Sequence, residues 1–336
     1  MKPPTTLSVH VSRFLSHYLS GQRDLSPNTI KAYRDVFVLL LRFCRDEKGH
    51  VIERLELQHI DAKLIGDFLD YLKNERHCST RTINQRLAVV HAFFRYVQVE
   101  DPEWLLQCQR ILGIRLRRYV RKEVGYLSKD YLAALLKQPD TKRDNGRRDA
   151  VLLSLLYDTG ARVQEIINLT AGDIRLETPA QVRILGKGRK VRVVPLMENT
   201  VCLLRQYIDE NGLALPQQYD LPLFSNRQGN PLTRAGVNYI LQKYVKKAQE
   251  SLPAFKQKVT PHTLRHTKAM HLVECGVSLD IVRDFLGHAD IKTTELYARA
   301  NLEMKRAAIE KISPTPVPDI PSWKENKTLL EWLQRL

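Results

Sequence analysis

A strongly basic stretch divides the helical pattern of the chain into two parts. The segment RLRRYVRKEVGY, residues 115–126, has no continuous apolar face, and a new helix start follows at Ser128. Its cations are Arg115, Arg117, Arg118, Arg121 and Lys122. Such a run is usually a solvated surface, but between two basic domains it is at least as well suited to follow a phosphate backbone. Because 336 residues fit two domains better than one core, we expect residues 115–126 to link two domains.

The part before this linker, residues 1–114, has the periodicity of amphipathic helices. Apolar residues recur at helical spacing in four segments: 8–19, 25–49, 61–77 and 79–98. Residues typical of helix ends are Ser26, Pro27 and Gly49 in the second segment, Asp61 in the third, and Ser79 or Thr80 in the fourth. Short polar connections between such helices predict a compact helical bundle.

The part after the linker, residues 127–312, combines helices with one pair of strands. Helical patterns cover residues 128–138 and 146–160 and resume after the strands. Two alternating, β-branched segments, 181–185 and 191–196, flank the glycine-containing turn GKGRK, as in a β-hairpin. The predicted fold class is therefore mainly α with a small β-sheet (α+β), with an N-terminal helical domain followed by a mixed domain.

Prolines at positions 314, 316, 318 and 321 interrupt the chain after Ile312. The segment that follows has a capping box in Ser322 and Glu325, and its apolar residues Leu329, Trp332, Leu333 and Leu336 fall at helical spacing. We expect residues 313–336 to form a proline-rich tether and a C-terminal helix. That helix either folds back on its own core or docks on a neighbouring subunit, and the reach of the tether favours the second.

The formal net charge is +16, and it is distributed over both parts of the chain. Residues 1–126 hold 21 Lys and Arg against 14 Asp and Glu, which gives +7 and leaves +9 for the remainder. Many basic proteins bind no polyanion, but this distribution favours a nucleic-acid partner over an acidic membrane. Five widely spaced cysteines and no apolar run of membrane-spanning length indicate a cytoplasmic protein without membrane attachment.

Two helix starts carry cations suited to an anionic ligand. Arg162 follows Gly160 at the start of a helix, and Glu165 shares its face, so the two side chains can pair. Such a pair is usually an ordinary surface ion pair, but it can also hold a guanidinium fork for two anionic oxygens. Thr260 and Pro261 start a second helix, with His262 in the first turn and Arg265 one turn later. These two either form a phosphate site at the helix start or lie on a solvated face.

Three further residues are candidates that depend on partners elsewhere in the chain. Lys187 lies in the GKGRK turn, where it is either solubilising or aimed at another molecule. His288 follows a predicted helix end, and Tyr297 lies in the early turns of the next helix. A tyrosine hydroxyl, with a pKa of about 10, needs a base and a cationic cradle to act as a nucleophile.

A metal site is the weakest reading of the histidines in VTPHTLRHTKAMHL. His262, His266 and His271 lie there without a carboxylate or cysteine at ligand spacing. His266 falls among the apolar positions, which is typical of a hydrogen-bonded structural histidine. We expect no metal and no cofactor.

The order of these residues, with their local motifs, resembles the tyrosine recombinase (integrase) superfamily, especially its Xer-like and phage or transposon integrase members. The motifs are TGARVQEI, GKGRKVRVVPL, HTLRHTKAMHL and LGHADIKTTELY, and the resemblance covers residues 8 to 312. It implies that residues 1–114 form a helical, SAM-like core-binding domain that contacts DNA. It also implies that residues 127–312 form a catalytic domain of the DNA breaking-rejoining type.

The resemblance implies a role for each candidate. Tyr297 would attack a DNA phosphodiester, form a 3′-phosphotyrosyl bond and release a 5′-hydroxyl, without metal or ATP. Arg162 and Arg265 would hold the non-bridging oxygens, and His288 would donate a further hydrogen bond. Lys187 would protonate the departing oxygen, His262 would act in proton transfer, and Glu165 would brace Arg162. Two positions differ from many relatives: Arg299 replaces a histidine two residues after the tyrosine, and Lys268 replaces an aromatic residue after RHT.

DNA contacts are expected from both domains and from the linker. The candidates besides the linker cations are Asn28, Thr29, Lys31 and Arg34 in one helix start and Thr80, Arg81, Asn84 and Arg86 in another. The expected partner is double-stranded DNA with specific recombination sites, bound by a homotetramer that exchanges its C-terminal helices. A second recombinase or an accessory protein is a further possible partner.

The additional C-terminal segment favours an enzyme of a mobile element over an Xer-like resolvase of chromosome or plasmid dimers. A type IB topoisomerase and a non-enzymatic DNA-binding regulator are the remaining alternatives. The presence of all six catalytic-type residues argues against the regulator.

Overall fold

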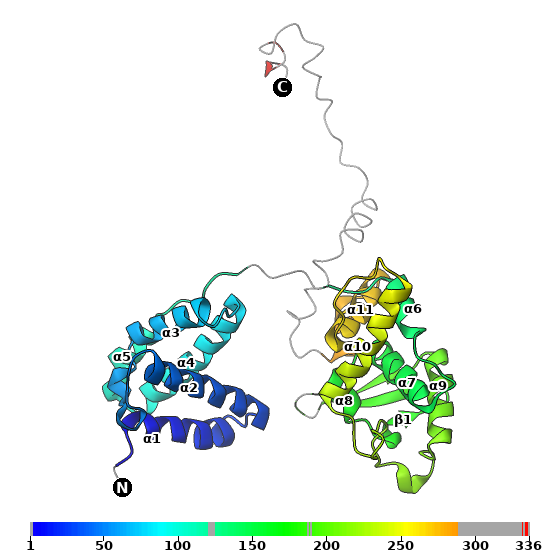
Figure 1. Ribbon diagram of the computed structural model, residues 1–336, viewed down its shortest axis with the longest axis horizontal. Coiled ribbons are helices and arrows are strands. Elements are labelled where there is room, and N and C mark those ends of the chain that lie inside the picture. The colour runs from blue at the N-terminus through cyan, green and yellow to red at the C-terminus, as the bar shows by residue number, and fades with distance from the viewer. Residues whose placement is uncertain are drawn as a thin grey trace. The chain divides into compact units, whose positions relative to one another are not determined.

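The computed structural model describes residues 3–119, 125–186, 188, 190–287, 331, 333 and 334. Two compact units divide the chain between Lys122 and Glu123, inside the predicted linker (Figure 1). Within the described residues, no helix is long and apolar enough to cross a membrane. The fold class is mainly α with a small sheet, as predicted.

The first unit is a helical bundle. Its helices are α1 (Thr6–Arg13), α2 (Pro27–Asp46), α3 (Ala62–Asn74), α4 (Thr80–Glu100) and α5 (Leu105–Leu112). A π-helical segment, η1 (Phe14–Gln22), continues α1, and short 3-10 turns lie at Ile52–Arg54, Leu57–His59 and Pro102–Trp104. The predicted helix over residues 8–19 is therefore two segments, because the backbone changes from α to π at Phe14. Within η1 the rings of Phe14 and Tyr18 stack, with centroids 5.6 Å apart.

The predicted helix starts of this unit are confirmed by their hydrogen bonds. The side chains of Ser26, Asp61 and Ser79 each accept a hydrogen bond from the backbone N–H three residues on. Ser79, rather than Thr80, is the cap of α4. Gly49 lies just beyond the end of α2 with φ +68°, a conformation that favours glycine.

The core of the first unit is rich in phenylalanine. Phe14 is fully buried and meets Phe37 and Phe93 edge-on, at 6.1 and 5.4 Å between ring centroids. Burial of each such side chain contributes roughly 2–3 kcal/mol relative to exposure. Rings from η1, α2 and α4 therefore hold these segments together although they are distant in sequence.

The second unit surrounds helix α7 (Asp144–Asp158). Six of its apolar side chains, between Ala150 and Leu156, are buried, and α7 contacts both α9 (Glu198–Glu210) and α11 (Pro261–Glu274) (Figure 1). The other helices are α6 (Lys129–Leu136), α8 (Val163–Ile167), α10 (Arg234–Ser251) and α12 (Leu279–Leu286), with short 3-10 turns at Ala171–Asp173 and Pro216–Gln218. Ser128 caps α6 and Thr260 caps α11, both as predicted.

The sheet of the second unit has three antiparallel strands in the order β1 (Ile174–Arg175), β2 (Gln181–Leu185) and β3 (Val191–Pro195). The predicted hairpin is confirmed, with Leu185 opposite Val191 and Gln181 opposite Pro195. The N–H of Gly186 donates to the carbonyl of Lys190 at 2.8 Å, which closes the turn. Strand β1 was not predicted, because two residues are too short to show an alternating pattern.

Candidate active site

A turn between α7 and α8 places Arg162 at the edge of the second unit. Gly160 has φ +54°, and a Cβ at this position would lie 2.7 Å from Cδ2 of Leu286. Glycine therefore fits both the left-handed conformation and the close approach of α12. Arg162 follows as the N-cap residue of α8, with its side chain 34% exposed and thus open to a ligand.

Glu165 binds Arg162 twice, so the predicted pairing is confirmed. One carboxylate oxygen accepts from Nη1 of Arg162 at 2.7 Å, and the other accepts from the backbone N–H of Arg162 at 2.9 Å. The pair is not an ordinary surface ion pair, because Glu165 is buried. Burial alone would raise the pKa of Glu165, but hydrogen bonds from Arg192 and Arg162 hold that pKa below its usual value. Glu165 is therefore ionised at neutral pH.

Arg265 is buried, so its placement on a solvated helix face is wrong. Its Nη1 donates to the carbonyl of Gly160 at 2.6 Å, and its Nη2 donates to the carbonyl of Leu286 at 2.7 Å. This guanidinium joins the end of α7 to the end of α12. A guanidinium held by two backbone carbonyls is positioned before any ligand arrives.

His262 lies within electrostatic reach of both arginines. Burial, then Arg265, then Arg162 lower the pKa of His262 below its usual value. His266 neighbours it, with ring centroids 6.3 Å apart, and burial, His262 and Arg265 lower the pKa of His266 to about 4. Both rings are therefore neutral at pH 7, and a neutral imidazole can accept a proton as well as donate one.

The structure thus brings together Arg162 and Glu165 at the start of α8 with His262 and Arg265 of α11, two segments about 100 residues apart in sequence. Lys187, His288 and Tyr297 lie outside the described residues, as do Arg121 and Lys122 of the linker. The described residues that come just before Lys187 and His288 in the sequence lie beside the cluster. A Cβ on Gly186 would lie 3.7 Å from Oε1 of Glu165, and the carbonyl of Leu286 is bound by Arg265.

The cluster has an excess of positive charge. Glu165 is shared by Arg162 and Arg192, whose Nη2 donates to it at 2.7 Å. Arg265, bound to carbonyls of Gly160 and Leu286, adds a third guanidinium. A cluster of three guanidinium groups with one carboxylate favours an anion with several oxygens, such as a phosphodiester.

Sequence reasoning did not identify Arg192, although a signal for it existed. On β3, Arg192 lies on the same side as Val194, which is buried, and opposite Ile184, which is also buried. A charged residue at an inward-facing strand position must find a partner, and only the fold reveals that the partner is Glu165.

Lys268, one of the two departures from the family pattern, is part of the packing behind this cluster. Its ammonium lies 4.8 Å from the ring centroid of Tyr157 and 3.9 Å from Oδ1 of Asp158. Burial lowers the pKa of Lys268, and the carboxylate of Asp158 opposes that shift. At this position many relatives have an aromatic residue, whereas in this chain the ammonium of Lys268 lies over the aromatic ring of Tyr157.

The histidines do not form a metal site in the described parts of the chain. No group of three or more His, Cys, Asp or Glu residues there is arranged to hold a metal ion. His271 is occupied by structure: its Nε2 lies 3.0 Å from the carbonyl of Leu127 and its Nδ1 lies 2.9 Å from the hydroxyl of Tyr157. A ring with both nitrogens hydrogen-bonded is not available as a ligand.

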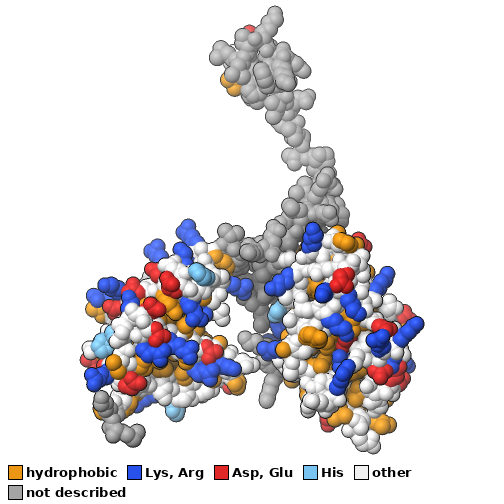
Figure 2. All heavy atoms as spheres, in the orientation of Figure 1, with side chains coloured by type: hydrophobic (Ala, Val, Ile, Leu, Met, Phe, Trp, Pro, Cys, Tyr) orange, Lys and Arg blue, Asp and Glu red, His pale blue; other side chains and the backbone are white. Residues whose placement is uncertain are grey.

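The predicted DNA-binding cations of the first unit are exposed or partly exposed. Arg34 pairs with its neighbour Asp35, and Arg117 pairs with Asp70 at 2.6 Å. Lys31 and Arg81 are exposed at the starts of α2 and α4, while Arg86 donates to Sγ of Cys78 at 3.1 Å. Arg115 and Arg118 are described and exposed. Figure 2 shows Lys and Arg side chains spread over the visible face of each unit.

Asn84 has a structural role that sequence reasoning missed. Its Nδ2 donates to the carbonyl of Arg117 at 2.8 Å, and its Oδ1 accepts from the N–H of Arg117 at 2.9 Å. The side-chain amide of Asn84, one of the candidates for DNA contact, joins the start of the linker to α4. This contact joins residues 33 positions apart, which no local pattern reveals.

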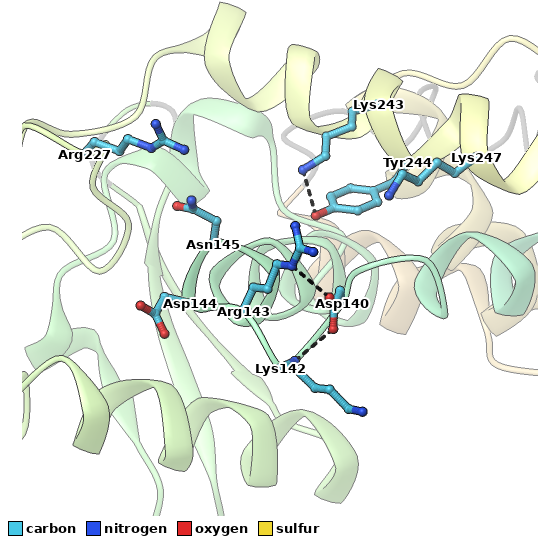
Figure 3. A pocket seen from close by; sticks show the side chains of 10 residues that line it. Asp140, Lys142, Arg143, Asp144, Asn145, Arg227, Lys243, Tyr244 and Lys247 are labelled. Carbon is cyan, nitrogen blue, oxygen red and sulfur yellow. Dashed lines mark hydrogen bonds and ion pairs between the residues drawn. The ribbon is translucent and has the colours of Figure 1, made fainter.

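A basic hollow lies at the opposite end of α7 from the Arg162 cluster (Figure 3). Its volume is about 670 Å³, and its charged lining residues are Lys142, Arg143, Arg227, Lys243, Lys247, Asp140 and Asp144. Arg143 is directed toward Asp140 at 3.2 Å, and the ammonium of Lys243 toward the hydroxyl of Tyr244 at 3.2 Å. Because the 15 residues of α7 span about 22 Å at 1.5 Å per residue, the hollow is separate from the Arg162 cluster.

Both units match known families. Residues 125–304 match the phage integrase family, and residues 11–100 match the SAM-like N-terminal domain of phage integrases. The integrase/recombinase-type protein y4rC of Sinorhizobium fredii is 39% identical over 316 residues, which cover 94% of this chain and 94% of that protein. The tyrosine recombinase XerD of Staphylococcus epidermidis is 33% identical over 304 residues, covering 89% of this chain and 96% of XerD.

Solved structures share the fold. The Tn1549 transposon integrase in complex with transposon right end DNA has a TM-score of 0.68 at 20% identity, covering 90% of this chain and 99% of that chain. The XerH site-specific recombinase bound to a palindromic difH substrate has a TM-score of 0.66 at 23% identity, covering 86% and 81%.

Proposed function

The chain belongs to the phage integrase family, tyrosine recombinases that cleave and rejoin DNA, and on this premise we propose that Tyr297 is its nucleophile. The observation that supports this proposal most is the convergence of Arg162, His262 and Arg265 at one turn. In the proposed reaction these residues bind a scissile DNA phosphate, and Tyr297 becomes joined to that phosphate, which stays on the 3′-oxygen of the cleaved strand.

The proposed cleavage step is a phosphoryl transfer in which positioning and charge stabilisation dominate. The Tyr297 hydroxyl oxygen bonds to phosphorus, and the bond from phosphorus to the 5′-oxygen breaks. Neutral His262 accepts the tyrosine proton, and Lys187 gives a proton to the departing 5′-oxygen. Arg162 and Arg265 bind the non-bridging oxygens, on which negative charge accumulates, and His288 donates one further hydrogen bond.

Glu165 has a supporting part in this proposal. It holds the guanidinium of Arg162 through one oxygen and its backbone N–H through the other. Because the guanidinium is partly exposed, it keeps N–H groups free for a phosphate. The phosphotyrosyl bond retains the energy of the ester, so attack by a 5′-hydroxyl reverses the step without ATP.

The proposed substrate is double-stranded DNA with specific recombination sites. The supporting features are the exposed cations at the starts of α2 and α4 and in the linker, which suit phosphate contacts. With them we propose a SAM-like core-binding domain over residues 1–114, a linker over 115–126, a catalytic domain over 127–312 and a tether with a terminal helix over 313–336. A location in the cytoplasm, on the nucleoid, follows from such a substrate.

We also propose assembly as a homotetramer on DNA, with C-terminal helices exchanged between subunits. The amphipathic spacing of Leu329, Trp332 and Leu333 supports this, although the helix itself lies almost entirely outside the described residues. The role we favour is the mobilisation or integration of a DNA element. Resolution of chromosome dimers is the alternative, and the 33% identity to XerD is the observation that favours it.

Trapping on nicked DNA tests the proposed chemistry and finds the site. The protein is mixed with a pool of duplexes, each nicked so that the short strand beyond the cleavage point diffuses away and cannot be rejoined. The expected result is a covalent protein–DNA adduct enriched in one sequence, which sequencing of the bound strand identifies. A protein that binds the pool but forms no adduct contradicts the proposal.

Strand exchange separates the recombinase from a type IB topoisomerase. Two duplexes of different length that carry the trapped sequence should yield recombinant products. Relaxation of supercoiled DNA without any exchanged product would favour the topoisomerase.

A further inference from the structure

Arg192 is a largely buried cation whose position on the sheet calls for an explanation. It is the second residue of β3 and faces the same side as the buried Val194. Its side chain is only 11% exposed. An arginine is expensive to bury without hydrogen-bonding partners, so its contacts show what it does at this position.

Two contacts join Arg192 to different parts of the site. Its Nη2 donates to Oε2 of Glu165 at 2.7 Å, and its Nε donates to the carbonyl of Phe285 at 3.1 Å. The first partner is the carboxylate that holds Arg162, and the second belongs to the last turn of α12. One planar guanidinium therefore connects β3, the start of α8 and the end of α12.

The end of α12 is held by two arginines at successive carbonyls. Arg192 binds the carbonyl of Phe285, and Arg265 binds that of Leu286. Gly287 follows with φ +64°, and a Cβ there would lie 3.1 Å from Nη1 of Arg192. Glycine thus allows Arg192 to lie directly against the backbone that leads into His288.

We propose that Arg192 is a positioning residue that fixes Arg162 and the end of α12 relative to each other, and so sets the geometry of the phosphate cradle. The proposal rests on the proposed function of that cradle. Arg192 itself does not touch the phosphate in this account. It acts through Glu165 on Arg162 and through Phe285 on the segment that begins at Gly287.

The proposed role requires two N–H donors from one side chain, whereas neutralising the charge of Glu165 would require only a cation. Lysine at position 192 would keep the positive charge, but one ammonium lacks the planar fork that serves Glu165 and the Phe285 carbonyl together. Arg192→Lys should therefore have an intermediate defect, and Arg192→Gln a full one. Arg183→Gln is the control, because Arg183 lies on the neighbouring strand β2 and pairs with Asp173 at 3.0 Å instead of with Glu165.

The first test is cleavage of the duplex recovered by trapping, at saturating protein. Arg192→Gln should lower the single-turnover rate constant about 100-fold, as expected for a small misplacement of catalytic groups, while the Kd for DNA changes less than about threefold. A second duplex carries an uncharged methyl group in place of one non-bridging oxygen of the scissile phosphate. On this duplex the ratio of the wild-type rate to the Arg192→Gln rate should be at least about threefold smaller, because a less charged phosphate depends less on the cationic cradle. Wild-type rates in Arg192→Gln, or an equal loss on both substrates, would overturn the proposal.

The second test does not require activity. Backbone hydrogen exchange in the full chain should accelerate about tenfold or more over residues 279–287 in Arg192→Gln and stay unchanged in α9. Unchanged exchange over residues 279–287, or equal acceleration in α9, would show that Arg192 does not hold α12 specifically. If the wild type forms no adduct, the proposed function fails, whereas the exchange experiment still decides the role of Arg192.

Discussion

In the second unit, the largely buried Arg192 and the buried Arg265 donate to carbonyls 93 and 105 residues away in sequence. In the first unit, Arg34 and Arg45 pair with the adjacent residues Asp35 and Asp46 while their side chains remain more than half exposed. Buried cations with distant partners are fixed by the fold, and exposed cations with local partners are free to rearrange. Catalysis of phosphoryl transfer benefits from the first kind, and binding along a phosphate backbone needs only the second.

The largest effect is expected at Arg265. Arg265→Gln should lower the rate of covalent adduct formation at saturating protein by about 1,000-fold or more, because an oxygen-stabilising donor and the link between α7 and α12 are lost together. Arg227→Gln, in the basic hollow at the far end of α7, removes the same charge and should have no effect on the rate. Circular dichroism should show that both variants fold. If Arg265→Gln altered only the affinity for DNA, the distinction between cations fixed by the fold and exposed cations with local partners would fail.

Glu165 should show a smaller effect of the same kind. Glu165→Gln keeps the shape but removes the charge between Arg162 and Arg192, and single-turnover cleavage should slow about 10- to 100-fold. Gln164, the preceding residue, is partly exposed and its side chain bonds to Asn168 and Arg234 rather than to the arginines of the cluster, so Gln164→Ala is a control. A Glu165→Gln enzyme with wild-type cleavage would show that Arg162 needs no brace.

The histidines of α11 whose pKa values are lowered should make the second unit sensitive to acid. Burial and neighbouring charges lower the pKa of His266 to about 4, whereas an unfolded histidine titrates near its ordinary value of about 6.5. The unfolded chain therefore binds more protons between these values, and stability falls as the pH decreases from 6.5 toward 4. This histidine should reduce the free energy of unfolding by roughly 1–2 kcal/mol between pH 7 and pH 5.

Urea unfolding at the two pH values measures this effect. His266→Gln should weaken the pH dependence of the second unit without removing it, since the pKa values of His262 and His271 are also lowered. If His266→Gln left the pH dependence of the free energy of unfolding unchanged, the attribution of this dependence to His266 would be wrong.

The smallest effects are expected in the first unit. Arg34→Gln and Arg81→Gln should each weaken DNA binding by several-fold and reduce the slope of log K against log salt by about 1. Cleavage at saturating protein should remain at the wild-type rate. A titration of binding at several salt concentrations gives both quantities. A slower cleavage rate at saturating protein in either variant would contradict the account in which cations of the first unit affect only DNA binding.

What the sequence predicted well depends on local chemistry. The caps at Ser26, Asp61, Ser128 and Thr260 and the hairpin around residues 186–190 follow from residue types within a few positions of each other. The pairing of Arg162 with Glu165 is likewise a matter of helical spacing.

What the sequence did not predict depends on contacts between distant segments. Asn84 is bound to Arg117, Arg192 to Phe285, and Arg265 to Gly160, and each of these pairs is separated by more than 30 residues. The π-helical turns after Arg13 also have no local signal, whereas Phe14 within them packs against Phe93 of α4. Local patterns therefore located the elements, and the fold determined which polar groups they bring together.

The central claim is that this cluster serves a covalent attack by Tyr297. The most direct measurement is mass spectrometry of the peptide that carries DNA after trapping on the nicked duplex. The account predicts that the 3′-phosphate of the cleaved strand is attached to Tyr297 and that Tyr297→Phe binds the same duplex without forming the adduct. An adduct on another residue, attachment through a 5′-phosphate, or an undiminished adduct in Tyr297→Phe would contradict it.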